Sequence, residues 1–262
     1  MTPAELELIA VVAAHAGASV LERAFGGRRA LSVETKSAKD YVTVVDREAE
    51  AAIVEVLSRE TPEFPILAEE GSPRQARTGH RWIVDPLDGT TNFIHGVPTF
   101  AVSIGLEDEA GLLAGVVHDP CRHETFAAHR GGGARLDGRP IVVSRPRGLE
   151  SAVLATGFPF RKLDQLPAYL VAFERFCRTT SGLRRAGSAS LDLAYTASGR
   201  YDGFFEVGLS PWDVAAGALL VIEAGGVVTD TGGGPDFLES GSIVAGSPEM
   251  HAAMLEVTRG TL

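Results

Sequence analysis

The chain has 262 residues, of which 45% are hydrophobic and 22% are charged, an ordinary balance for a globular protein of one large or two modest domains. Lysine and arginine number 24 against 34 for aspartate and glutamate, and the formal charge of −10 argues against non-specific affinity for DNA or an anionic membrane. Phosphate substrates are not excluded by this charge, because bound divalent cations reverse the local field of an acidic pocket.

The N-terminal segment and the cysteines favour a cytoplasmic protein. Glu5 and Glu7 interrupt the apolar core that a secretory signal would need. The two cysteines, Cys121 and Cys177, have no neighbouring cysteine or histidine at zinc spacing, so we expect reduced side chains that serve in packing. We find no run of about 18 apolar residues and therefore predict no membrane span.

Helical periodicity predicts two helices near the start of the chain. Thr2 and Glu5 have the spacing of a capping box, and apolar residues then recur at helical intervals until Gly26. A second helix is predicted after Asp46, and it ends before Pro62. Each helix carries an apolar stripe, which is typical of a helix that packs on one side.

Short strands are predicted after these helices. They are apolar runs bounded by turn residues, at 64–68, 82–84, 100–106, 112–117 and 124–128. Asp137 and Gly138 then predict a hairpin turn.

Beyond Pro140 the pattern changes to strands that alternate with helices. The strands are predicted at 152–156, 201–206, 227–229 and 243–245, and the helices at 167–177, 188–197, 212–224 and from Ser247 onward. The chain is therefore predicted to be α/β, with an α+β N-terminal half and an α/β C-terminal half. We place the domain boundary between residues 142 and 143, giving domains of residues 1–142 and 143–262.

The segment 82–93, WIVDPLDGTTNF, is the most informative in the chain. Its apolar start predicts a buried strand, and its proline and glycine predict a tight turn where that strand ends, so Asp85 and Asp88 should converge at the strand's carboxyl edge. Two carboxylates about 4 Å apart repel by roughly 4 kcal/mol at an effective dielectric near 20, so such a site usually also holds a cation. Hard oxygen ligands indicate magnesium.

Residues 89–91 open the next predicted element, where free backbone N–H groups favour a bound phosphate. Asp46, Glu69 and Asp213 also lie at the ends of predicted elements, where side chains converge on a common cleft. Each acid has an alternative interpretation. Asp46 and Asp213 could cap their helices, and Glu69 could be a solvated surface charge.

Competing catalytic designs need residues that this chain lacks. Neither cysteine is followed six residues later by an arginine, so the loop of a cysteine phosphatase is absent. No GxGxxG or GxxxxGK(S/T) pattern occurs, and the acids in the turn are spaced DxxD instead of the DxD of an aspartyl-phosphate loop. His95 and His118 remain candidate acids or bases, although a lone loop histidine is more often structural.

The chain resembles the inositol monophosphatases, which are magnesium-dependent, lithium-sensitive phosphatases. Five segments carry the resemblance, in the family's order: Lys36 with DYVTVVD at 40–46, AEEG at 68–71, WIVDPLDGTTNFIHG at 82–96, GSASLDLAYTASGRYDGFFEVG at 187–208, and PWDVAAGALLVIEAGG at 211–226. The third and fifth segments resemble the family's two signatures. The resemblance implies a layered αβαβα sandwich of the inositol monophosphatase and fructose bisphosphatase type.

The resemblance also implies the residues of a metal centre. Its ligands to two or three magnesium ions would be Glu69, Asp85, Asp88, Asp213 and the backbone carbonyl of Leu87. Asp85 would bridge two of the ions, and Glu69 would take part in catalysis as well as in binding. A metal lowers the pKa of water, and paired metals stabilise both the attacking and the leaving oxygen.

Catalytic and substrate-binding roles follow from the same resemblance. Thr90 and Asp46 would form the dyad that orients and deprotonates the attacking water, and the backbone N–H groups of Gly89 and Thr90 would hold phosphate oxygens. Substrate hydroxyls would bind at Glu206. Ala189 and Lys36 would line the same pocket. The segment 157–165 is similar to bacterial members of the family rather than to animal ones, and it is expected to approach the substrate.

The predicted reaction is hydrolysis of a small phosphate monoester, with myo-inositol monophosphate as the first candidate and other sugar or polyol phosphates after it. Alternatives with the same fold are a fructose-1,6-bisphosphatase and a 3'-phosphonucleotide phosphatase. An alternative of another class is a non-catalytic partner of the transcription machinery. The resemblance favours a homodimer, and no direct binding of nucleic acid or membrane is expected.

Overall fold

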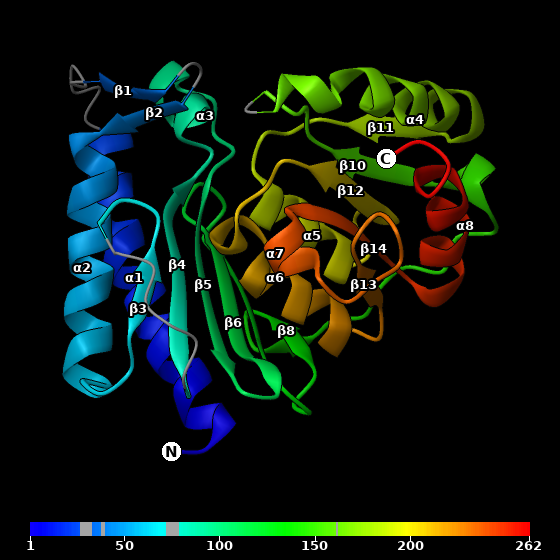
Figure 1. The fold of residues 1–262 in the computed structure, drawn as a ribbon. Coiled ribbons are helices and arrows are strands. Elements are labelled where there is room, and N and C mark those ends of the chain that lie inside the picture. Colours follow the sequence, from blue (N-terminus) through cyan, green and yellow to red (C-terminus); the bar gives the residue numbers. More distant parts are fainter. Residues whose placement is uncertain (27–32, 38–39, 72–78, 161) are drawn as a thin grey trace.

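The computed structural model describes residues 1–26, 33–37, 40–71, 79–160 and 162–262, with only the backbone path of residues 33–42. Helices and sheets alternate in five layers, as Figure 1 shows from left to right. A helix pair covers a seven-stranded sheet, a middle helix layer separates it from a five-stranded sheet, and two further helices cover the far side. This arrangement confirms the predicted αβαβα sandwich.

The first layer consists of α1 (Pro3–Gly26) and α2 (Val44–Glu60). The predicted capping box is present, since the Thr2 N–H donates to Glu5 over 2.7 Å and the Glu5 N–H donates to the Thr2 hydroxyl over 3.3 Å. The predicted start of α2 was wrong. Thr43 is its N-cap, so the helix begins at Val44 and Asp46 lies inside its first turn.

Among the described helices, α1 is the one long and apolar enough by composition to cross a membrane, with a mean hydropathy of 1.5 over its most apolar window. In the fold this apolar character is used in packing. One face of α1 is buried against α2 and the seven-stranded sheet, and its side chains there include Leu6, Ala13 and Leu21 at no more than 1% exposure.

The seven strands of the first sheet lie in chain order: β3 (Ile66–Ala68), β4 (Arg81–Asp88), β5 (Ala101–Asp108), β6 (Gly111–Asp119), β7 (Glu124–His129), β8 (Ala134–Leu136) and β9 (Arg139–Pro140). Only the β3–β4 pair is parallel. Asp137 and Gly138 form the predicted hairpin turn between β8 and β9, with positive φ angles of 49° and 76°. A two-stranded ribbon of β1 (Val33–Ser37) and β2 (Asp40–Thr43) was not predicted.

Strand β4 does not end at Val84, where the sequence predicted a turn. It continues to Asp88, and the register shifts between the pairs Asp85–Ser103 and Asp88–Ala101. The extra residue of this bulge accommodates Pro86, which has no N–H to donate to a regular ladder. The bulge thus keeps both acids on one strand.

The second sheet is mixed, with the strand order β11-β10-β12-β14-β13. Its strands are β10 (Val153–Thr156), β11 (Gly182–Arg184), β12 (Gly203–Val207), β13 (Val227–Thr229) and β14 (Ser242–Gly246). The helices of this half are α4 (Leu166–Thr179), α5 (Ala189–Ala197), α6 (Pro211–Glu223), α7 (Phe237–Ser240) and α8 (Pro248–Thr258). Two 3₁₀ turns lie at Leu149–Ser151 and Leu163–Gln165, and α3 (Thr90–His95) follows β4 in the first half.

Helices α5 and α6 form the middle layer, and one apolar core reaches from the first sheet through them to the second. A side-chain carbon on Gly105 would lie 2.8 Å from the Cβ of Ala215, and one on Gly115 would lie 2.9 Å from the carbonyl oxygen of Ala216. Glycine at both positions therefore lets α6 lie directly on β5 and β6. The boundary between residues 142 and 143 stays a prediction, with β9 before it and β10 after it.

Candidate active site

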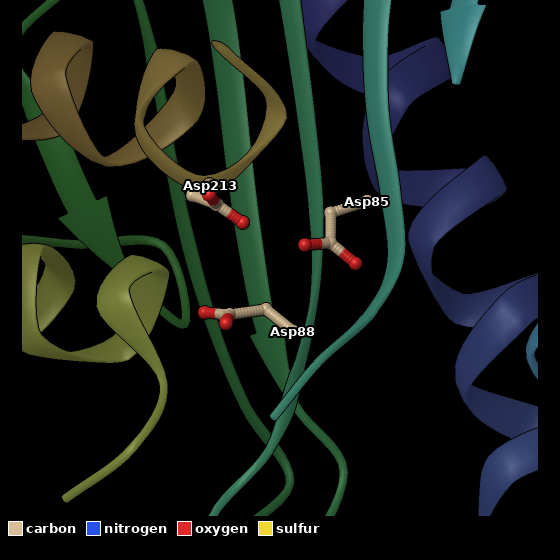
Figure 2. Close-up of side chains that lie close together, drawn as sticks. All are labelled: Asp85, Asp88 and Asp213. Atoms are coloured by element: carbon tan, nitrogen blue, oxygen red, sulfur yellow. The ribbon is translucent and has the colours of Figure 1, made fainter. Parts of the chain in front are cut away.

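Three buried acids meet where β4 ends against the start of α6. Each of Asp85, Asp88 and Asp213 offers a carboxylate oxygen within 4.8 Å of those of the other two. Figure 2 shows the carboxyl groups of Asp85 and Asp213 facing each other, with Asp88 beside them. Their exposed fractions are 1%, 8% and 8%. Acids distant in sequence thus converge, as the sequence predicted.

Negative charge is concentrated in this cluster. Burial raises the pKa of Asp85 well above its usual range, and repulsion from Glu69, Asp88 and Asp213 raises it further. Burial also raises the pKa of Asp88, against the opposing effect of hydrogen bonds from Ser190 and Ser188. Carboxylates buried this close together repel one another, and a hard divalent cation bound between them would remove that repulsion.

Asp88 is held by the start of α5. Its Oδ2 accepts hydrogen bonds from the Ser188 hydroxyl at 2.7 Å, the Ser190 N–H at 2.7 Å and the Ser190 hydroxyl at 2.6 Å. Sequence reasoning missed both serines. The only available signal was the position of Ser188 as an N-cap, which says nothing about a partner 100 residues earlier in the chain.

Asp213 and Asp46 both cap their helices, one of the two interpretations that the sequence left open. Each is the third residue of its helix and closes a capping box, with Ser210 before Asp213 and Thr43 before Asp46. The Ser210 N–H donates to Oδ2 of Asp213 over 2.7 Å. Because a carboxylate has two oxygens, capping a helix and facing the site are compatible.

The turn after β4 links Leu87, Thr90 and Asp46. The Thr90 hydroxyl lies 3.1 Å from Oδ1 of Asp46 and 3.1 Å from the carbonyl oxygen of Leu87. The Leu87 N–H donates to Oδ1 of Asp85 over 2.9 Å. Burial raises the pKa of Asp46, while hydrogen bonds from Thr43 and Thr90 lower it. Gly89 makes the turn possible, since its φ of 103° is a left-handed conformation.

A cavity of about 550 Å³ opens from the acid cluster toward the second sheet. Among the predicted site residues it is lined by Glu69, Asp85, Leu87, Asp88, Gly89, Thr90, Ala189, Glu206 and Asp213. Asp46 lies behind Thr90 and does not line the cavity. The side chain of Lys36 lies outside the described part of the chain. Among the described residues, His95 and His118 do not line the cavity.

The cavity is also lined by residues that the sequence analysis did not name as site residues. Phe158 and Phe160 belong to the segment expected near the substrate, and the guanidinium of Arg185 packs over their rings at 5.7 Å and 5.3 Å. Arg185 is the only cation among the described lining residues. Asp192 also lines the cavity, and its three- and four-residue spacing from Ala189 and Ser188 could have indicated this.

Comparison with known proteins matches this geometry to one family. A profile of the inositol monophosphatase family matches residues 3–260. The chain is 51% identical to Nus factor SuhB from Pseudomonas aeruginosa over 94% of this chain and 93% of that protein. It is 45% identical to inositol-1-monophosphatase from Mesorhizobium japonicum over 98% of this chain and 97% of that protein. The crystal structure of the extragenic suppressor protein suhB from Bartonella henselae superposes with a TM-score of 0.93 at 43% identity, over 98% of this chain and 100% of that one. The chain belongs to the inositol monophosphatase family.

Proposed function

We propose that this protein is a magnesium-dependent phosphate monoester hydrolase whose substrate is an inositol monophosphate. The observation that carries the proposal is the convergence of Asp85, Asp88 and Asp213 at one end of a cavity that Glu206 also lines. The family and the 45% identity to a protein named inositol-1-monophosphatase support the same reaction.

The metal ligands would be the carboxylates of Glu69, Asp85, Asp88 and Asp213 together with the carbonyl oxygen of Leu87. Bound divalent cations would polarise the phosphoryl oxygens, lower the pKa of water and stabilise the leaving oxygen. The protein contributes prearranged carboxylates on rigid elements, so little reorganisation is needed during the reaction.

Thr90 and Asp46 would accept the proton that the attacking water loses. The Thr90 hydroxyl can donate its proton to Oδ1 of Asp46, and the lone pairs of the same oxygen can accept a hydrogen bond from water. Asp46 is buried and oriented by Thr43, so it can draw the proton from Thr90 as Thr90 receives one.

The substrate would lie between the acid cluster and the second sheet. The backbone N–H groups of Gly89 and Thr90, at the turn beside Asp88, would donate to phosphate oxygens. Glu206 and Ala189 line the part of the cavity that would receive the alcohol, where a carboxylate accepts hydrogen bonds from hydroxyl groups.

A panel of phosphate esters tests this function. Phosphate release is measured from inositol 1-phosphate, fructose 1,6-bisphosphate and a 3'-phosphonucleotide, each with magnesium, with EDTA, and with magnesium plus lithium. The proposal expects magnesium-dependent, lithium-inhibited release that is fastest from inositol 1-phosphate. Faster release from either of the other two esters would assign the protein to the corresponding alternative.

A second candidate function is a role beside the transcription machinery, favoured by the 51% identity to a protein named a Nus factor. Complementation of a strain that lacks the gene separates the two functions. Rescue by an Asp88→Asn variant without phosphatase activity would favour the partner role, whereas loss of rescue would favour the enzyme.

A further inference from the structure

Asp192 is an acid on a fully buried helix, where acids are rare. It lies on α5, whose nine residues are all buried in the middle layer, and its own exposed fraction is 1%. One of its carboxyl oxygens, Oδ1, has no hydrogen-bond partner among the described residues. A buried polar group without a partner is costly, so its presence calls for an explanation outside the folding of α5.

The position of Asp192 points to the cavity. Ser188 and Ala189 precede it by four and three residues on the same helix face, and all three residues line the cavity. Burial raises the pKa of Asp192 well above its usual range, and the nearby charges of Glu206 and Asp88 raise it further. A neutral carboxylic acid can both donate and accept a hydrogen bond, which suits a hydroxyl group as its partner.

Glu206 lines the same cavity and lies close enough to Asp192 for its charge to raise the pKa of Asp192. It comes from β12, and its carboxyl group lies directly over the α-carbon of Gly157. A side-chain carbon at position 157 would lie 1.9 Å from Oε1 and 2.3 Å from Oε2 of Glu206. Glycine is therefore required at position 157 for Glu206 to keep this place.

We propose that Asp192 is a second specificity-determining residue, which joins Glu206 in one subsite that hydrogen-bonds two hydroxyl groups of a polyol leaving group. The proposal rests on the phosphatase function proposed above and adds a residue to its substrate site. The Glu206 carboxylate accepts a hydrogen bond from one hydroxyl, and Asp192 exchanges a hydrogen bond with the second. A leaving group without hydroxyls gains nothing from either residue.

Two variants of Asp192 test the subsite with two substrates, inositol 1-phosphate and phenyl phosphate. Asp192→Leu keeps the branched shape of the side chain but removes its hydrogen bonding. We expect the ratio of kcat/KM for inositol 1-phosphate to that for phenyl phosphate to fall about tenfold, mainly through KM. Asp192→Asn keeps a donor and an acceptor, and we expect a ratio within about twofold of wild type. Asp236→Asn, at an exposed acid that does not line the cavity, is the matched control.

A structural role for Asp192 would give another result. It would lower the melting temperature and reduce kcat/KM for both substrates by the same factor, so an unchanged ratio in Asp192→Leu overturns the proposal. An equal fall of the ratio in Asp192→Asn and Asp192→Leu overturns it as well. If the wild type hydrolyses neither substrate with magnesium, the proposed function fails first, and the subsite fails with it.

Gly157→Ala provides a test that leaves the buried helix intact. The added carbon displaces the flexible end of Glu206, so the same substrate ratio should fall about tenfold while the fold is retained. A wild-type ratio in Gly157→Ala, with inositol 1-phosphate hydrolysed normally, would overturn the joint subsite even if Asp192→Leu does not fold.

Discussion

The Thr90 hydroxyl lies 3.1 Å from Oδ1 of Asp46, so a hydrogen bond connects the first turns of α3 and α2 across 44 residues of sequence. The other oxygen of Asp46 accepts a hydrogen bond from the Thr43 N–H at 2.9 Å. Asp46 therefore has a fixed orientation and offers its Oδ1 to the Thr90 hydroxyl.

Replacement of Thr90 by valine should abolish most activity without unfolding the protein. Valine has the shape of threonine but no hydroxyl, so the proton path to Asp46 is lost and kcat should fall by about 10²- to 10⁴-fold. Thr90→Ser keeps the hydroxyl and is the matched control. A Thr90→Val enzyme with wild-type kcat, measured by phosphate release, would remove Thr90 from the mechanism.

Asp88→Asn should separate metal binding from folding. The amide oxygen of asparagine can still accept the hydrogen bonds from Ser188 and Ser190, while one negative charge leaves the cluster. We expect turnover to fall by about a hundredfold or more, and the melting temperature in EDTA to stay at or above that of wild type. Calorimetry of the metal-free proteins measures this difference, and a cooperative loss of the fold would contradict it.

The contact between α6 and the first sheet should be sensitive to one methyl group. Gly115→Ala places a carbon 2.9 Å from the carbonyl oxygen of Ala216, which is rigid backbone, and should lower the free energy of unfolding by about 1–3 kcal/mol. Magnesium affinity should weaken as well, because α6 carries Asp213. Gly26→Ala is the control, since nothing lies within 4 Å of the added carbon. Urea denaturation that gives equal stability for both variants would contradict the tight seating of α6.

His118 should make stability depend on pH. Burial lowers its pKa from 6.5 to about 4, with a further lowering by His15. Between these two pH values the unfolded chain binds more protons than the folded protein, so the free energy of unfolding should decrease as pH falls from 6.5 toward about 4. His118→Asn should flatten that slope, and urea midpoints across this pH range measure it. An unchanged slope would show that other groups cause the pH dependence.

The sequence predicted most of the layered fold, because helices such as α1 and strands such as β5 have strong apolar periodicity. It did not predict that β4 continues past Pro86, because the bulge depends on pairing with β5, which local patterns do not show. It also missed β11, a three-residue strand that begins with glycine and pairs, among the described strands, with β10 alone.

The residues of the candidate site were likewise predicted only in part. The acids of the DPLDGT turn and Asp213 were found because short motifs place carboxylates at the ends of elements. Ser190 and Asp192 were missed, because their partners and their burial arise only when α5 enters the middle layer. Contacts between distant segments therefore account for the part of the site that the sequence alone left undetected.

The proposed function requires Asp85, Asp88 and Asp213 to bind divalent cations together, beside the phosphate of the substrate. Anomalous scattering from a crystal soaked with manganese in place of magnesium, and with inorganic phosphate, locates these cations. We predict anomalous peaks within about 2.5 Å of carboxylate oxygens of all three residues, with phosphate in contact. Manganese bound only elsewhere, with these carboxylates free of metal, would rule out this metal centre.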